Sequence, residues 1–235
     1  MYRYETHCHT SETSKCGITG AADFVRFFKN KGYDGVFITD HFFRANIVDI
    51  PENYSWEQKV DVLLRGYEVA REEGAKVGLD VFLGWEFGYE SLHLLTYGLD
   101  REWLLDNPDL ISLDYIHYCD RVHESGGFIV NAHPFRQVKG VVRLMPYNSD
   151  AAEIINGANA DNKRSAAYAE MMGLPVTAGS DIHNKNTKAN LAGVLSETKF
   201  GSVYDYIDAV KNRKVTLFEF PNTADQIQNE RIVTP

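Results

Sequence analysis

Short apolar runs alternate with longer amphipathic segments along most of the chain. In a recurring pattern, an apolar run follows a glycine-containing stretch and ends in a polar side chain that can bind a metal ion. Glycine supplies the left-handed conformation that ends many helices, and uninterrupted apolar strands of this length are typical of a parallel sheet covered on both faces. The four clearest examples span residues 31–41, 73–86, 125–133 and 172–181.

The amphipathic segments between these runs predict helices over about 20–31, 55–74, 111–125 and 201–212. Alternation of strands and helices indicates an α/β fold, and 235 residues suit a single domain the size of an α/β barrel. We therefore expect one barrel domain over residues 1–221, followed by a polar tail over 222–235.

The polar residues that end the runs are mostly histidines and carboxylates. His7 and His9 are two apart on a predicted strand, so both project to the same side. Asp181 and His183 have the same spacing after a later run. The other strand ends carry His41, Glu86 and His133. Imidazoles and carboxylates gathered at strand ends are the donors that a multi-metal hydrolytic centre needs.

Three further histidines have weaker patterns. His93 lies in the strand-like run 91–98, seven residues after Glu86, and is either a further ligand or a half-buried structural histidine. His117 and His123 fall in the predicted helix 111–125 without a partner motif, so we expect solvated or packing roles for both.

Together these motifs resemble those of the PHP (polymerase and histidinol phosphatase) family of metal-dependent phosphoesterases. The resemblance runs from residue 5 to about residue 185 and implies a distorted (β/α)7, TIM-like barrel. It further implies two or three divalent metal ions at the C-terminal ends of the strands, with Glu86 as the bridging ligand. By position, the ligands that it implies are His7, His9, His41, Glu86, His93, His133, Asp181 and His183.

One position departs from the family pattern. Relatives place an Asp or His shortly before a glycine that follows the His-x-His pair, whereas this chain has Cys16 before Gly17. A thiolate is a competent ligand, especially for zinc, and Glu12 on the same loop is the competing candidate for the ninth ligand. A small packed residue is the third interpretation of Cys16. Glu5 and Asp40 are expected to orient ligating histidines through hydrogen bonds.

The resemblance implies a phosphoesterase in which metal-activated hydroxide attacks a small phosphorylated substrate, with a phosphomonoester preferred. The catalytic residues would be Glu86, Asp181 and His183. Arginine or lysine side chains would neutralise the phosphoryl oxygens, and the candidates are Arg136, Lys139 and Arg164. Zinc, manganese and iron all accept such mixed donor sets. The loops 42–55 and 134–150 follow proposed ligands, so they are expected to select the substrate.

Three other functions share some of these features. A nuclease that trims 3′ ends, or a nucleotide phosphodiesterase, is the alternative enzyme, and the net charge of −9 weighs against a nucleic-acid partner. A non-catalytic, metal-stabilised docking module would be expected to lose ligands. A hydrolase of the amidohydrolase type usually has a lysine bridge, whereas this chain has Glu86.

Composition restricts the cellular setting. No apolar run reaches 18 residues, which argues against a membrane span, and the N-terminus lacks the pattern of a secretory signal. The three cysteines are too few for a disulfide framework. We therefore expect a cytoplasmic protein. The sequence does not indicate the oligomeric state.

Overall fold

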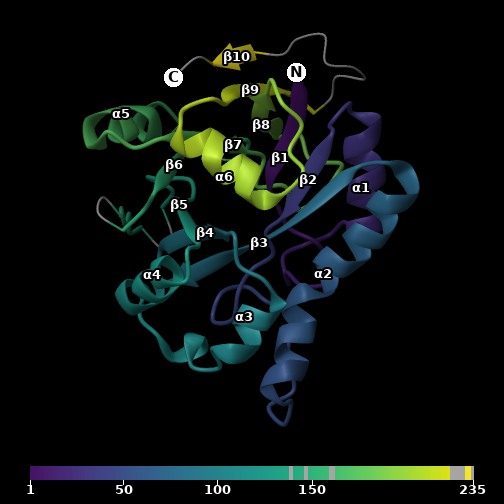
Figure 1. The fold of residues 1–235 in the computed structure, drawn as a ribbon, viewed down its shortest axis with the longest axis vertical. Coiled ribbons are helices and arrows are strands. Elements are labelled where there is room, and N and C mark those ends of the chain that lie inside the picture. Colours follow the sequence, from purple (N-terminus) through teal and green to yellow (C-terminus); the bar gives the residue numbers. More distant parts are fainter. Residues whose placement is uncertain (138–139, 146–147, 159–161, 223–230, 234–235) are drawn as a thin grey trace.

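The computed structural model describes residues 1–137, 140–145, 148–158, 162–222 and 231–233 (Figure 1). The strands are β1 (Tyr2–Cys8), β2 (Gly35–Ile38), β3 (Asp80–Tyr89), β4 (Leu92–Tyr97), β5 (Phe128–Asn131), β6 (Ala151–Asn156), β7 (Val176–Gly179), β8 (Asn190–Ser196), β9 (Thr216–Pro221) and β10 (Arg231–Val233). The α-helices are α1 (Ala21–Asn30), α2 (Trp56–Val77), α3 (Arg101–Asp106), α4 (Tyr115–Glu124), α5 (Asn162–Met172) and α6 (Val203–Lys211). The predicted α/β class is confirmed.

The ten strands form one sheet in the order β10-β9-β8-β1-β2-β3-β4-β5-β6-β7. The sheet is mixed, whereas the apolar runs had predicted a parallel one. Strands β1 to β3 are parallel, as are β5 to β7, but β4 is antiparallel to both of its neighbours. Only Glu90 and Ser91 separate β3 from β4, which is too short a connection for the crossover that parallel strands require.

Strand β7, the last in this order, lies next to β1. Beyond β7, Ile182 forms a parallel bridge with Cys8, and the Ile182 carbonyl accepts a hydrogen bond from His9 N at 3.0 Å. The hydroxyl of Thr6 donates to the Ala178 carbonyl at 2.6 Å. The sheet therefore curls, and the chain segments that follow β1, β2, β5 and β7 meet at one rim.

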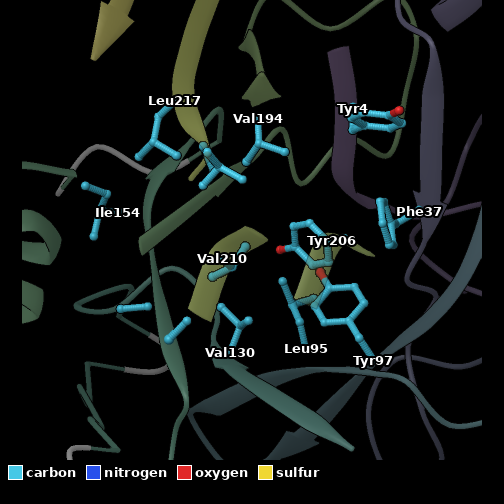
Figure 2. Packing of buried hydrophobic residues seen from close by; sticks show 14 of the residues in the cluster. Tyr4, Phe37, Leu95, Tyr97, Val130, Ile154, Val194, Tyr206, Val210 and Leu217 are labelled. Carbon is cyan, nitrogen blue, oxygen red and sulfur yellow. The ribbon is translucent and has the colours of Figure 1, made fainter. Parts of the chain in front are cut away.

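Aromatic packing fills the opposite end of the curled sheet. Tyr206 of α6 has its ring centroid 4.7 Å from that of Phe37 and 5.2 Å from that of Tyr97 (Figure 2). The Tyr206 hydroxyl lies 2.9 Å from Thr177 Oγ1, so its polar end is also satisfied. Tyr97 pairs with Phe128 at the start of β5, away from the rim that follows that strand. This apolar layer leaves the rim as the place where polar side chains gather.

Two predicted helices have different bounds in the structure. Helix α2 begins at the Ser55–Gln58 capping box but runs past Gly74 to Val77 and ends at Gly78, whose φ is +71°. A Cβ at Gly74 would lie 2.6 Å from the Leu79 carbonyl, so this glycine permits close packing and does not end the helix. The predicted helix 111–125 is divided into a 3₁₀ turn at Leu110–Ser112 and α4, which Asp114 caps through the backbone N–H of Ile116 and His117.

The C-terminal part of the chain contacts the rest of the fold at two places. The Asn222 amide donates to the carbonyls of Lys185 (3.0 Å) and Thr187 (2.7 Å), and β10 pairs with β9. Residues 223–230 and 234–235 of the predicted tail lie outside the described residues, so the boundary at 221 stays a prediction. No helix within the described ranges has the length and apolar character to cross a membrane.

Candidate metal centre

The rim brings together the histidines and carboxylates that the sequence singled out. Their ligand atoms form three overlapping groups in which every atom lies within 4.8 Å of the others. The groups are His9–His41–His183, His7–His9–Asp181 and His7–Glu86–His133. The shared members make one continuous cluster, and its role as a ligand set stays a prediction.

Strand geometry explains how these side chains meet. His7 and His9 point into the cluster, whereas Cys8 between them packs in the core with Phe24 and Val36. Backbone pairing also continues beyond β2, because His41 forms a parallel bridge with Glu86. The side chains that follow adjacent strands are thereby held next to each other.

His93 reaches the same rim from the beginning of a strand. It pairs with Gly88 near the start of β4, and its Nδ1 lies 2.9 Å from Glu86 Oε1. Because β4 runs antiparallel, its first residues lie beside the last residues of β3. The reversal of this strand is therefore what allows His93 to join the cluster.

Two members of the cluster have left-handed backbone conformations. His133 has φ +29° and Asp181 has φ +52°. Non-glycine residues adopt such values at a cost, and they persist where surrounding contacts hold them. Glu153 Oε2 accepts the His133 N–H at 2.8 Å, and Glu5 accepts the N–H of Ser180 at 2.9 Å next to Asp181. The strained backbone aims both side chains into the cluster.

Glu86 lies between five imidazoles, of which His7 is the farthest, with its Nε2 3.6 Å from Glu86 Oε1. Its Oε1 is 2.9 Å from His93 Nδ1 and 3.0 Å from His133 Nε2. Its Oε2 is 2.7 Å from His41 Nδ1 and 3.5 Å from His9 Nε2. Three imidazoles at Oε1 and two at Oε2 are the surroundings expected of a carboxylate that bridges two cations.

Polar atoms without hydrogen-bond partners support cation binding. Among the described residues, the buried His41 Nδ1 and Glu86 Oε2 form no aligned hydrogen bond, although they are 2.7 Å apart. His7 Nε2 and His9 Nε2 lie 3.0 Å apart, where at most one proton fits between them. Burial of unsatisfied polar atoms is costly, and divalent cations would satisfy His41 Nδ1 and Glu86 Oε2. They would also bind the lone pairs of the two facing Nε2 atoms. The nitrogen and oxygen donors therefore fit zinc, manganese or iron.

The electrostatics favour ligating protonation states at two carboxylates and one imidazole of the cluster. At His7 and His41, burial opposes protonation, but the neighbouring carboxylates raise both pKa values, that of His41 to about 10. Burial alone would raise the pKa of Asp181, but His7 and its neighbours hold it well below its ordinary value. Glu86 behaves similarly: burial opposes ionisation, and His93 and His41 lower its pKa well below the usual range. Burial lowers the pKa of His9, and the neighbouring imidazoles add to this effect. Ionised carboxylates and a neutral His9 are the forms that bind metals.

The two candidates for the ninth ligand have different surroundings. Glu12 accepts the Ala21 N–H with both carboxylate oxygens, at 3.0 and 2.9 Å, and thus holds the start of α1. The Cys16 thiol contacts His183 and His41; burial opposes ionisation, but these contacts lower its pKa to about 6. The geometry thus favours Cys16 over Glu12, and neither is tested as a ligand.

Replacing Cys16 with serine is expected to lower the bound metal by about one ion per chain, because a neutral hydroxyl is a much poorer zinc ligand than a thiolate. Elemental analysis of the purified protein measures this ratio. Cys119→Ser is the control, because Cys119 is buried in α4 outside the cluster. An unchanged ratio in Cys16→Ser would return the assignment to Glu12.

Glu5 and Asp40 contact ligand candidates indirectly. Glu5 accepts the backbone N–H of His7 at 2.8 Å, and burial raises its pKa to about 7. Asp40 accepts a hydrogen bond from the Ser14 hydroxyl at 2.6 Å, and Ser14 Oγ lies 3.3 Å from His9 Nδ1. Neither carboxylate touches a ligand ring directly.

The sequence reasoning missed Glu153 and Asn156 on β6. Glu153 is fully buried, and its Oε1 lies 2.9 Å from His7 Nδ1. Asn156 Nδ2 donates to Glu153 Oε2 at 2.8 Å. No recognisable motif surrounds them, and the available signal was a carboxylate inside the apolar run Ala151–Asn156.

A cleft of about 560 Å³ opens over the cluster and is lined by Cys16, His41, Arg44, Ala45, Asn46, Gly88, Glu90, His93, Arg136 and His183. Of the three cations predicted to bind substrate, Arg136 lines this cleft and donates to Asp181 Oδ2 at 2.7 Å. Arg164 is exposed on α5, and Lys139 lies outside the described residues.

The two helical histidines lie outside the cluster, in agreement with their expected roles. His117 Nδ1 is 2.9 Å from Asp114 Oδ1 on the surface of α4. His123 Nε2 is 3.0 Å from Asp150 Oδ2 and is only partly exposed.

No protein-family model and no curated protein matches the chain. Solved structures do match it. One is a two-domain protein from Bacteroides vulgatus containing a predicted PHP-like metal-dependent phosphoesterase, with 18% identity over 92% of this chain and a TM-score of 0.67. The chain covers 64% of that protein, which is less than two thirds of its length.

For two further structures, the match with this chain covers nearly the whole length of the solved protein. A candidate metal-dependent phosphoesterase from Bifidobacterium adolescentis is 17% identical over 89% of this chain and 96% of its own, with a TM-score of 0.52. An amidohydrolase from Chromobacterium violaceum, with bound sulfate and no metal, is 13% identical over 94% of this chain and 98% of its own, with a TM-score of 0.53. The chain thus shares its fold with structures named as PHP-like metal-dependent phosphoesterases, as its motifs had predicted.

Proposed function

We propose that the protein is a metal-dependent phosphoesterase that hydrolyses phosphomonoesters of small molecules. The observation that carries this proposal is the position of Glu86 between five imidazoles, with Asp181 completing the cluster. The curled sheet would then be a distorted (β/α)7 barrel, with two or three divalent ions at its rim.

Divalent cations bound there would supply hydroxide near neutral pH and polarise a phosphoryl oxygen. The chain's own residues would hold and orient the substrate. Arg136 has a partly exposed guanidinium beside Asp181, so it can turn to donate to phosphoryl oxygens. His183 would either bind a metal ion together with His9 and His41 or protonate the leaving oxygen. Burial opposes its protonation, but Cys16 and Asp181 raise its pKa.

The size and charge of the cleft favour a small substrate. A volume of about 560 Å³ falls within the range of pockets that bind small molecules. The net charge of −9 weighs against a nuclease acting on long polyanions. Arg44 from the loop 42–55 and Arg136 from the loop 134–150 line the cleft, which supports a role for these loops in substrate choice.

An amidohydrolase activity is the second candidate, because the Chromobacterium violaceum structure with that name has a similar fold. The carboxylate of Glu86 in the bridging position speaks for the phosphoesterase. A docking module without activity is disfavoured by the number of ligand-type side chains in the cluster.

The test is a screen of purified protein, with its metal content measured, against phosphomonoesters, phosphodiesters and amides. Phosphate release from monoesters is expected, and His133→Ala serves as the inactive control. Hydrolysis of amides alone would favour the second candidate, hydrolysis of diesters alone would favour the nuclease, and no turnover with bound metal would favour the docking module.

A further inference from the structure

The carboxylate of Glu153 contacts ligand candidates from two different strands. Its Oε1 lies 2.9 Å from the Nδ1 of His7, which is on β1. Its Oε2 accepts the backbone N–H of His133, beyond β5, at 2.8 Å. Glu153 itself is fully buried on β6. One side chain thus connects the two histidines that share a group with Glu86.

We propose that Glu153 is a positioning residue that holds neutral His7 in the tautomer with the proton on Nδ1. This inference rests on the proposed function. A carboxylate only accepts hydrogen bonds, so its contact with Nδ1 requires a proton on that nitrogen. The Nε2 atom of His7 is then left with a free lone pair. This nitrogen faces the cluster, because it lies 3.0 Å from His9 Nε2 and 3.5 Å from Asp181 Oδ1. A carboxylate contact such as that of Glu153 orients the ring and increases its basicity as a ligand.

The two oxygens of Glu153 have different surroundings. Oε2 receives two donors, the His133 N–H and the Asn156 amide, whereas Oε1 faces only His7. Asn156 Oδ1 accepts the Ala158 N–H at 3.0 Å, which fixes the amide with its Nδ2 toward Glu153. The same Nδ2 lies 3.4 Å from Asp181 Oδ2. The carboxylate therefore has little freedom to rotate.

The backbone of β7 is close enough to restrict this contact further. A Cβ at Gly179 would lie 2.5 Å from His7 Cβ and 2.9 Å from Glu153 Oε1. Glycine at this position allows β7 to approach while the His7 ring stays against Glu153. Glu5 differs in this respect, because it accepts the backbone N–H of His7 and does not touch the ring.

Glu153→Gln tests the proposal. The glutamine oxygen should take the place of Oε2, where two donors require an acceptor, so its NH₂ group would face His7 Nδ1. That nitrogen must then be unprotonated, and the proton moves to Nε2. We expect the affinity for Zn²⁺, measured by calorimetric titration, to fall about 10- to 100-fold. The ¹⁵N shifts of the neutral ring, read at alkaline pH in metal-free protein, should show the change of tautomer.

Glu5→Gln is the matched control, since it removes an equally buried carboxylate that contacts His7 only through the backbone. This variant should keep the Nδ1–H tautomer. Wild-type Zn²⁺ affinity and an unchanged tautomer in Glu153→Gln would refute the proposal. A wild-type His7 with its proton on Nε2 would also refute it, without any variant having to fold. If the wild-type protein bound none of Zn²⁺, Mn²⁺ and Fe²⁺, the proposed function would fail, while the tautomer would still test the role of Glu153.

Discussion

Replacing Asp181 with alanine should lower phosphoester hydrolysis by about 1,000-fold or more, because a metal contributes several kcal/mol of transition-state stabilisation and each 1.4 kcal/mol is about tenfold in rate. Asp181 Oδ1 lies 3.5 Å from His7 Nε2 and 3.4 Å from His9 Nε2. Its Oδ2 accepts a hydrogen bond from Arg136. The variant loses a proposed metal ligand and, at the same time, the hydrogen-bond partner of Arg136, which is proposed to bind the phosphoryl oxygens. The measurement is kcat in metal-replete buffer with the best substrate from the screen.

Asp150→Ala is the matched control for this variant. Asp150 also pairs with a histidine, His123, but at a distance from the cluster. Asp150→Ala should therefore keep its activity, and circular dichroism should show that both variants are folded. His133→Ala should lose activity to a similar extent as Asp181→Ala. Full turnover by either cluster variant would contradict the assignment.

Features that depend on neighbouring residues were predictable from the sequence. Ser55 and Gln58 form a capping box, which is a local hydrogen-bonding pattern, and α2 begins where the apolar periodicity placed it. The ends of the strands could also be located, because each apolar run stops at a polar residue. Those ends gave the positions of His7, His41, His133 and Asp181 in the cluster. Glu86 was also predicted to end a strand, but β3 continues past it to Tyr89.

Features that depend on distant contacts were not predictable in the same way. Strand β4 is antiparallel because it forms a hairpin with β3. The apolar pattern of a strand is the same in either direction, so this pattern could not predict that β4 is antiparallel. Glu153 contacts His7, 146 residues away, so no local motif marks it. Glu12 and Cys16 share a loop, and only the folded chain shows that Glu12 holds the start of α1. In each case the deciding partner is remote in the sequence.

Metal binding should also determine how stable the protein is. The cluster buries His7, His9, Glu86 and Asp181 almost completely. Without cations, close nitrogen pairs and unpartnered oxygens oppose folding. A ligand that binds only the folded state stabilises it by mass action, and histidines in the unfolded chain bind metals far more weakly than a preformed cluster does.

Addition of Zn²⁺ or Mn²⁺ to metal-free protein is therefore expected to raise the melting temperature by about 10 °C. A cation at 1,000 times its Kd adds about 4 kcal/mol, and each kcal/mol shifts Tm by about 2–4 °C in a domain of this size. Scanning calorimetry with and without a chelator measures the shift. Glu86→Ala should lose most of it, because the variant lacks the carboxylate between the five imidazoles. A wild-type Tm that does not respond to saturating metal, or an equal response in Glu86→Ala, would mean that this cluster is not where the cations bind.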